Sequence, residues 1–568
     1  MLRHWAAAAA LSLVFLAGCA GGSASGNNGT ISPPPPAQQA DPDVLTYHND
    51  AARTGVQPNE ALLTAANVNP AAFGKLFAYP VDGYLYAQPL FVGAYIMADG
   101  NSHNVVFAAT SHGSVYAFDA DRQNPAQGYL WKENLAPAGE QVVTTADYGC
   151  GNPSPESGII GTPVIDRAAG LLYVVMKSKL IANGTTAYRQ RLHALNLADG
   201  SEKQGGPVLI QASVPGTGAG AQGGSVAFDP LKNNQRAALL LSGGGVWIAW
   251  ASHCDLGPYH GWVMGYSASN IAQQTSVFNN TPNGGDGGIW MGTGGLSADG
   301  SGAIYAVGGN GTFDANTGGS DYGDSALKLN APAASGGMMS VADWFAPSNQ
   351  LSLSNGDLDV GTTNALLFSD PGSTVASLAV VTDKTGRVYL LNRASMGKYD
   401  TGANGPDGKN GDLQDFTVGG LLFNNFAFFN NTLYIGANGQ PLAAYPYTPG
   451  TSTAAGKLST TPAQKTLTRF ADAGGAGGTS PVLSVDSFGL PTAVAGSAIV
   501  WAEDNSGANV VLHAYNAANL QMELYNSSQA ASGRDLGPPP VKFVSPVIGN
   551  GRVFIGGANA LVVYGLLP

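Results

Sequence analysis

The amino-acid sequence predicts an all-β chain folded as an eight-bladed β-propeller of four-stranded antiparallel blades. Strand-length apolar runs separated by turn residues recur along the chain, with almost no helical periodicity. One pattern repeats eight times: a small-residue or Ser/Thr-Pro start, a β-branched or aromatic strand, and a strand ending in an aromatic and a turn residue. The spacing of roughly 60–70 residues exceeds the roughly 40–50 of shorter propeller blades, and a fixed period of four-stranded units is the signature of a propeller.

The copies also predict how the ring closes. The clearest copy joins residues 87–90, 105–107 and 115–119, and the last copy, beginning at 545–547, stops at its third strand. A strand at 75–79 precedes the first copy without partners of its own. We therefore expect this N-terminal strand to supply the missing outer strand of the last blade, so that no long sheet edge is left open.

The first residues indicate targeting. Arg3 precedes an apolar run, residues 5–16, that is too short to span a bilayer as a mature helix. The run ends in Leu-Ala-Gly-Cys, which resembles a bacterial lipobox and predicts lipidation of Cys19. Ala20 in place of Asp favours the outer membrane, with the protein facing the periplasm or the cell surface. The alternative is an ordinary signal peptide with an accidental cysteine. The expected organisation is a signal peptide (1–19), a flexible Gly/Ser/Pro tether (20–42) and the propeller (43–568).

Composition narrows the function classes. The 568 residues include 79 Gly and 34 Pro, yet 44% are hydrophobic, which indicates a packed, turn-rich protein. A net charge of -12 with 11% charged residues argues against nucleic-acid binding. Besides Cys19 only Cys150 and Cys254 remain; an oxidising compartment would allow them to pair, but the sequence does not set their distance. Without a C-x-x-C-H motif, no covalently attached haem is expected.

A glycine-rich stretch around Trp290 is the first candidate site. It reads G-G-D-G-G-I-W and is followed by a short apolar strand that ends on Asn310. Glycines bring the backbone close to whatever occupies the neighbouring space, so a flat ligand lying on the indole face would suit this stretch. The alternative is a core tryptophan in a tight loop.

The long blades, and third strands of the form aromatic-x-aromatic-Asp/Asn, resemble the quinoprotein propellers, which are dehydrogenases using pyrroloquinoline quinone (PQQ) and calcium. Five positions match that family's functional residues in order. Trp290 falls at the tryptophan beneath the cofactor, and Asn310 in V-G-G-N-G at the metal-binding asparagine. Asp359 in D-L-D-V-G takes the place of the general base, which also contacts the metal. Lys384 in K-T-G-R-V-Y matches the quinone-side lysine, and Asp255 before Leu-Gly stands for the metal-binding glutamate.

The resemblance implies a PQQ- and Ca²⁺-dependent oxidoreductase without haem, which oxidises an alcohol or sugar and passes electrons to a separate acceptor. Three departures accompany it: the family's adjacent-cysteine disulfide is missing, Asp255 is shorter than glutamate, and Leu358 replaces the tryptophan before the general base. The alternative is a non-catalytic, lipid-anchored outer-membrane propeller that binds envelope proteins or polysaccharide.

Overall fold

The computed structural model describes residues 42–121, 128–292, 294–332, 336–400, 411–472, 477–487, 494 and 496–568. The expected signal peptide, the lipidation site Cys19 and all but the last residue of the expected tether lie outside the described residues. Within the described ranges, no helix is both long enough and apolar enough to cross a membrane.

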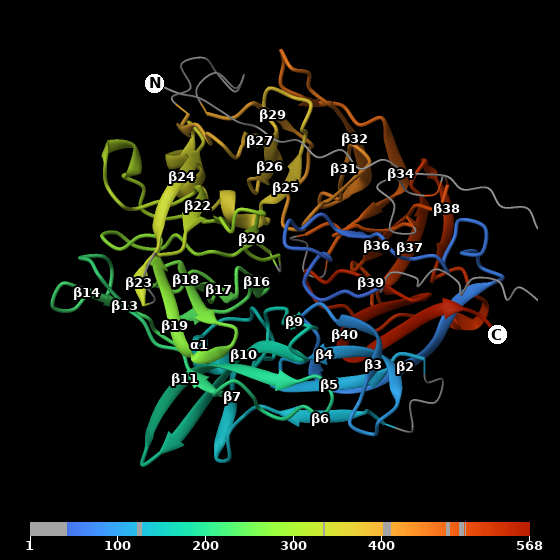
Figure 1. Ribbon diagram of the computed structural model, residues 1–568, viewed down its shortest axis with the longest axis horizontal. Helices are drawn as coiled ribbons and strands as arrows, with labels where there is room; N and C mark the ends of the chain where they lie inside the picture. The colour runs from blue at the N-terminus through green and yellow to red at the C-terminus, as the bar shows by residue number, and fades with distance from the viewer. Residues whose placement is uncertain are drawn as a thin grey trace, which may run out of the picture. The chain divides into compact units, whose positions relative to one another are not determined.

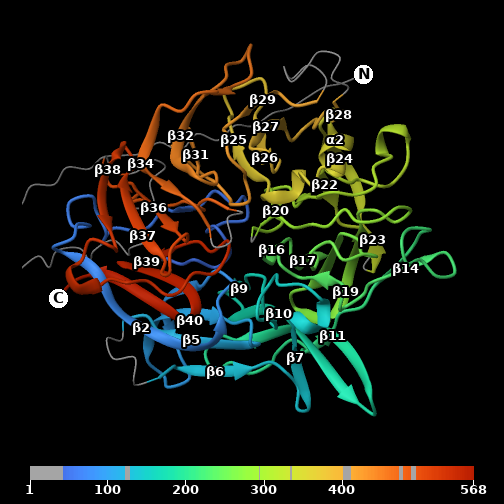
Figure 2. The ribbon, with the colours of Figure 1, turned by 180° about the vertical axis from the view of Figure 1, so that it is seen from behind.

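Eight sheets surround a common centre, and the chain passes from one sheet to the next once around the ring (Figures 1 and 2). Their strands pair antiparallel except for the edge strands β1, β23 and β28, which pair parallel. The predicted eight-bladed propeller is therefore confirmed. Counted over the described ranges, the eight sheets contain three to six strands, because short edge strands extend several of them beyond four. A two-stranded hairpin of β13 (Ser213–Pro215) and β14 (Ser225–Ala227) stands apart from these sheets.

The strands of the first four blades follow the order of the chain, from the innermost outward. Blade 1 contains β3 (Leu90–Ile96), β4 (Ser102–Ala109), β5 (Ser114–Asp119) and β6 (Trp131–Asn134). Blade 2 contains β9 (Val164–Asp166), β10 (Leu171–Ala182), β11 (Thr185–Asn196) and β12 (Val208–Leu209), with β7 (Glu140–Thr144) and β8 (Glu156–Ser157) alongside β10. Blade 3 contains β16 (Leu240–Ser242), β17 (Gly245–Ser252), β18 (Trp262–Ser267) and β19 (Asn270–Asn279), extended by β15 (Asn233–Asn234) and β23 (Gly337–Met338). Blade 4 contains β20 (Ser297–Ala298), β21 (Ile304–Val307), β22 (Ala326–Asn330) and β24 (Ser340–Ala346), extended by β28 (Lys398–Tyr399).

The remaining blades repeat this order. Blade 5 contains β25 (Leu366–Ser369), β26 (Ser377–Thr382), β27 (Arg387–Asn392) and β29 (Gln414–Thr417). Blade 6 contains β30 (Ala427–Phe429), β31 (Thr432–Ile435), β32 (Gln440–Thr448) and β34 (Gln464–Phe470), with β33 (Lys457–Leu458) also on β32. Blade 7 contains β35 (Val482–Ser484), β36 (Ile499–Asp504), β37 (Val511–Asn516) and β38 (Asn519–Asn526), preceded by β1 (Val56–Gln57). Blade 8 contains β39 (Val547–Gly549), β40 (Arg552–Leu566) and β2 (Phe73–Tyr84). The short helices are α1 (Thr145–Tyr148), α2 (Gln350–Asn355), η2 (Ala315–Thr317), η3 (Val360–Thr362) and η4 (Ala531–Gly533).

The N-terminal strand closes the ring as the sequence predicts. β2 pairs antiparallel with β40, from Phe73 opposite Leu566 to Tyr84 opposite Ala558. The predicted strand at 75–79 lies inside β2, whereas the last two predicted strands of the eighth copy lie within the single element β40. Joining both ends of the chain in one sheet leaves neither end of the ring with a free edge.

The segment 44–55 plugs the centre of the ring. Arg53 is fully buried and donates to the carbonyl oxygens of Leu239 and Leu296, beside the innermost strands of blades 3 and 4. Backbone N–H groups of the innermost strands donate to the plug in the order of the blades: Ile165 to Leu45, Ala298 to Ala51, Leu367 to Ala52, Phe428 to Thr54 and Leu483 to Gly55. This segment therefore joins blades that do not touch one another directly.

Candidate functional site

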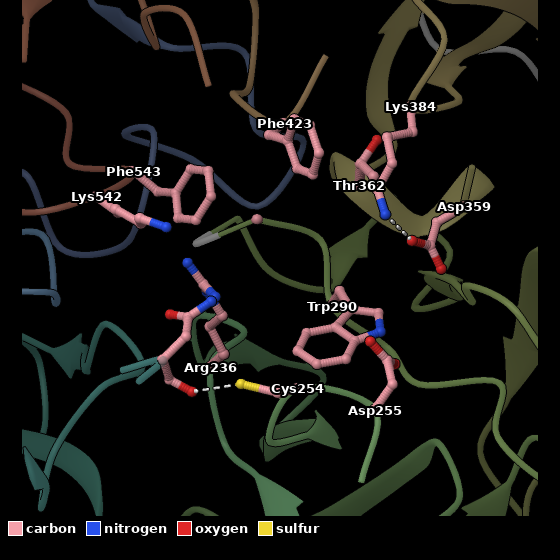
Figure 3. A pocket seen from close by; sticks show the side chains of 12 residues that line it. Arg236, Cys254, Asp255, Trp290, Asp359, Thr362, Lys384, Phe423, Lys542 and Phe543 are labelled. Carbon is pink, nitrogen blue, oxygen red and sulfur yellow. Dashed lines mark hydrogen bonds and ion pairs between the residues drawn. The ribbon is translucent and has the colours of Figure 1, made fainter. Parts of the chain in front are cut away.

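A pocket with a cavity volume of about 160 Å³ opens between the loops at the centre of the ring. Residues of blades 2, 3, 4, 5, 6 and 8 line it, mostly from loops just before an innermost strand. The lining side chains are Asn152, Arg236, Cys254, Asp255, Trp290, Asp359, Thr362, Lys384, Phe423, Lys542 and Phe543, together with Gly292 (Figure 3). Asn425, just beyond Phe423, donates its Nδ2 to the hydroxyl of Tyr47 in the plug. The plug thus lies behind the pocket.

The five positions predicted from the sequence come together here. Trp290, Asp255, Asp359 and Lys384 line the pocket. Asn310 does not line it, but its backbone N–H donates to Asp359 Oδ1 over 2.8 Å. Its side-chain Oδ1 is buried without a hydrogen-bond partner. Side chains separated by more than a hundred residues of sequence therefore form one site.

Glycines on two sides hold Trp290 in place. A Cβ atom added to Gly288 would lie 2.9 Å from Trp290 Nε1. A Cβ atom added to Gly309 would lie 3.1 Å from Trp290 Cδ1 and 2.4 Å from Asp359 Oδ1. Both separations are too short for a real side chain, so these two positions require glycine. The close backbone contact expected from the glycine-rich stretch is present, and it leaves the half-buried indole facing the pocket.

Asp359 is buried and has contacts on both carboxylate oxygens. Oδ1 accepts the Asn310 N–H, and Oδ2 lies 2.8 Å from the ammonium of Lys384. The same ammonium lies 2.9 Å from Oδ1 of the exposed Asp357 and donates to the Asp357 carbonyl oxygen. These negative charges outweigh the effect of burial and raise the pKa of Lys384, which remains a cation at neutral pH.

The hairpin between β26 and β27 positions Lys384. The carboxylate of Asp383 accepts the backbone N–H groups of Thr385 and Arg387 and the hydroxyl of Tyr389, which fixes the turn. Gly386 has a φ of 90°, and a Cβ there would lie 2.4 Å from the carbonyl oxygen of Gly420. Only glycine satisfies both requirements, so the K-T-G sequence sets where the lysine points.

Asp255 stands on a strained loop at the mouth. Cys254 and Asp255 have φ angles of 49° and 53°, a conformation that L-residues other than Asn and Asp rarely adopt. Cys254 forms a disulfide with Cys150, which ties this loop to the segment after α1. Asp255 Oδ1 accepts the hydroxyl of the buried Tyr259. Desolvation, with added repulsion from Asp359 and Asp357, raises the pKa of Asp255 even though its side chain is exposed at the surface.

The pocket wall opposite Asp255 and Asp359 was not predicted from the sequence. Arg236 is 5% exposed, its Nε and Nη2 atoms have no hydrogen-bond partner, and its guanidinium lies 4.3 Å from the ring centre of Phe543. Burial lowers the pKa of Arg236 to about 10. Phe543 stacks near Phe423 with ring centres 6.2 Å apart, and Lys542 adds a second cation. The only sequence signal is position, since Arg236, Phe423 and Phe543 each precede the innermost strand of a blade.

The donor set suits a flat, anionic ligand. Figure 3 shows Trp290 between an acidic side with Asp255 and Asp359 and a basic side with Arg236 and Lys542. Two nitrogens of the buried Arg236 guanidinium lack a hydrogen bond, although the charge of Asp472 acts on it, so the basic side fits a carboxylate group. For a hard cation, the unpaired Asn310 Oδ1 and the carboxylates of Asp255 and Asp359 offer oxygens. In the described ranges, no three His, Cys, Asp or Glu side chains converge as a ready-made metal site.

Comparisons with known proteins agree with this fold. Neither a protein-family model nor a curated protein sequence matches the chain. Among solved structures, a quinohemoprotein alcohol dehydrogenase from Comamonas testosteroni superposes with a TM-score of 0.56 at 14% identity, covering 93% of this chain and 81% of that one. A europium-containing methanol dehydrogenase superposes with a TM-score of 0.55 at 11% identity, covering 92% and 98%. At such identities the likeness establishes the propeller fold alone.

Proposed function

We propose that the chain is a quinone-dependent dehydrogenase that oxidises an alcohol or a sugar in the central pocket and passes electrons to a separate acceptor. One observation carries the proposal: Trp290, Asp359 and Lys384, matched to the quinoprotein family in sequence, share a single pocket, and two guanidinium nitrogens of Arg236 on its other wall lack a hydrogen bond. Concave sites with aromatic walls and a few converging polar groups are usual binding sites for small ligands.

Different residues of the pocket would bind the quinone and the calcium ion. PQQ is a flat tricarboxylic quinone that accepts two electrons from an alcohol carbon when bound. Trp290 offers it an indole face, while Arg236 and Lys542 are placed to bind carboxylates and the ring of Phe543 packs on the same side. Calcium would be held by Asp255, Asn310 and Asp359, all of them oxygen donors.

The acidic side would bind and deprotonate the substrate. The carboxylate of Asp359 is fixed on Oδ1 by the Asn310 N–H and is placed at the pocket wall, where it can take the hydroxyl proton of an alcohol. The ammonium of Lys384 balances negative charge on the same side. The plug behind the pocket and the aromatic rings of Phe423 and Phe543 limit the access of water.

Reconstitution tests the proposal. Purified protein is incubated with PQQ and calcium chloride, and binding is followed by calorimetry and by the absorption of the bound quinone. Turnover is measured as dye reduction with a panel of primary alcohols and aldoses. We expect micromolar or tighter binding, turnover with at least one substrate, and loss of turnover but not of binding in Asp359→Asn. A folded protein that fails to bind PQQ would contradict the proposal and favour a scaffold that binds envelope proteins or polysaccharide.

A further inference from the structure

A second cluster of buried polar side chains lies behind the Phe423–Phe543 wall, outside the pocket. Its members are Asn424, Asp472, Glu503 and Asn505, with exposed fractions of 3%, 2%, 1% and 2%. None of the four lines the pocket. The cluster has no part in the proposed dehydrogenase chemistry, so its presence in a dry interior needs another explanation.

Three stretches of chain bring these side chains together. A Cβ atom added to Gly477 would lie 2.0 Å from Asn424 Oδ1 and 3.0 Å from Asp472 Oδ2. These two oxygens therefore lie close together beside Gly477. The N–H of Asn505 donates to the carbonyl oxygen of Ala471, next to Asp472. Glu503 lies in β36, and Asn505 directly follows the end of this strand. The two residues are two positions apart, so their side chains point to the same face.

Three members of this cluster, Asn424, Glu503 and Asn505, have polar atoms without a hydrogen-bond partner. Both side-chain oxygens of Glu503, both polar atoms of the Asn424 amide and Oδ1 of Asn505 are buried without a hydrogen bond. Burial raises the pKa of Glu503 to about 8; the side chain of Asn505 opposes this rise and repulsion from Asp472 adds to it. An unpaired carboxylate in a protein interior costs several kcal/mol, and native proteins normally satisfy it with a counter-ion or a bound cation.

We propose that Asn424, Asp472, Glu503 and Asn505 form a binding site for a hard cation of the size of calcium. The four side chains offer two carboxylates and two amide oxygens, which is the chemistry that Ca²⁺ prefers. A site for zinc would instead contain nitrogen or sulfur ligands. The cation would neutralise Glu503 and satisfy the amide oxygens at the same time.

The site would also stiffen the pocket wall. Asp472 Oδ2 accepts the backbone N–H of Phe543 over 2.9 Å, and Asn424 directly follows Phe423 in the chain. Phe543 itself has a φ of 62°, an unfavourable conformation for a bulky residue. A cation held by Asp472 and Asn424 would fix both aromatic side chains of the wall from behind. This role does not depend on the chemistry inside the pocket.

Calcium binding to the quinone-free protein tests the site. The purified chain is stripped of metal with a chelator and titrated with calcium chloride by calorimetry, and thermal unfolding is recorded with and without calcium. Glu503→Gln removes one charge while keeping the shape, and Asn424→Asp adds a carboxylate. Asp255→Asn removes a carboxylate of the pocket and serves as the control for calcium bound there.

We expect calcium to raise the unfolding temperature of the unmodified protein and of Asp255→Asn alike. Glu503→Gln should bind calcium about tenfold more weakly or worse and lose this rise, whereas Asn424→Asp should bind more tightly. Without calcium, Glu503→Gln should be at least as stable as the stripped protein, because glutamine keeps the shape of the side chain and has no carboxyl group to ionise in the interior.

Two results would overturn the proposal. One is that Glu503→Gln and the unmodified protein show the same affinity and the same thermal shift, or that calcium affects neither, which would mean that the cluster holds buried water only. The other is that Asp255→Asn alone abolishes calcium binding, which would assign the ion to the pocket.

Discussion

The ammonium of Lys384 lies 2.8 Å from Asp359 Oδ2 and 2.9 Å from Asp357 Oδ1. One lysine thus links a carboxylate inside the pocket to a carboxylate at its rim. Asn310 contacts the same pair, since its N–H donates to Asp359 and its Nδ2 to Asp357. The hairpin of blade 5, the loop before β25 and the turn after β21 are therefore tied together at the acidic side of the pocket.

Replacing Lys384 with methionine should destabilise the protein. The change leaves Asp359, which is largely buried, without its counter-ion, and we expect the free energy of unfolding to fall by about 2–4 kcal/mol. Adding Asp359→Asn to Lys384→Met should restore part of the loss, because no unpaired charge remains. Urea unfolding measures both. Equal stability of the single variant and the unmodified protein would show that the ion pair adds nothing.

The same pair predicts a pH dependence. The pKa of Lys384 is raised above its ordinary value of 10.5, mainly by the charge of Asp359 against the effect of burial. Its stabilising contribution is therefore fully present below that ordinary value and is lost only as the pH rises through the higher, folded value. The stability difference between the unmodified protein and Lys384→Met should stay constant from about pH 6 to about pH 9. A stability difference that already shrinks across this range would contradict the raised pKa of Lys384.

Gly309→Ala should damage the site more than any ordinary glycine replacement. Its new methyl group would lie 2.4 Å from Asp359 Oδ1 and 3.1 Å from the indole of Trp290, so both must shift. We expect a loss of about 1–3 kcal/mol of stability and a marked loss of quinone binding. Gly300→Ala is the matched control, because a Cβ there meets nothing within 4 Å. Comparable effects of the two replacements would show that the close contact is unimportant.

Arg236→Met should weaken PQQ binding without lowering the stability of the folded protein. Without ligand, the guanidinium is buried and two of its nitrogens are unpaired, so methionine should leave the protein as stable or up to about 3 kcal/mol more stable. The affinity for PQQ should nevertheless fall, because the anion loses its partner. Calorimetry and thermal unfolding give the two readouts, with exposed Arg469→Met as the control. Destabilisation together with unchanged affinity would assign Arg236 a structural role instead.

The ring was predictable because each blade repeats one local pattern. The Thr-Pro or Ser-Pro start of an innermost strand, followed by two apolar strands, fixes a blade without reference to its neighbours. The unpaired strand at 75–79 and the truncated last copy then leave one way to close the ring. Edge strands such as β7 and β28 were not predictable, because they pair only where blade loops happen to reach a neighbouring sheet.

The site was predictable only on its acidic side. Trp290, Asn310, Asp359 and Lys384 stand in motifs whose order and turn residues match a known pattern, so each could be located along the chain. Arg236, Phe423 and Phe543 stand in irregular loops, and their convergence depends on the curvature of the whole ring. The pairing of Cys150 with Cys254 likewise depends on how two blades sit together, which spacing along the chain does not reveal.

Asp324 should make the protein less stable as the pH rises. It is fully buried, its Oδ1 accepts the N–H of Val360, and its Oδ2 has no partner. Burial, with added repulsion from Asp359 and Asp383 and opposed by Lys384, raises its pKa to about 8. Between its ordinary value of 3.8 and about 8 the folded protein keeps the proton while the unfolded chain releases it, so stability falls across this window by up to about 1.4 kcal/mol per pH unit.

Asp324→Asn keeps the acceptor for Val360 and removes the titration. The difference in unfolding free energy between Asp324→Asn and the unmodified protein should therefore widen from pH 4 to pH 8 and stay level below pH 4, as followed by urea unfolding at a series of pH values. Parallel pH profiles would mean that Asp324 is ionised in the folded protein, with a counter-charge balancing it.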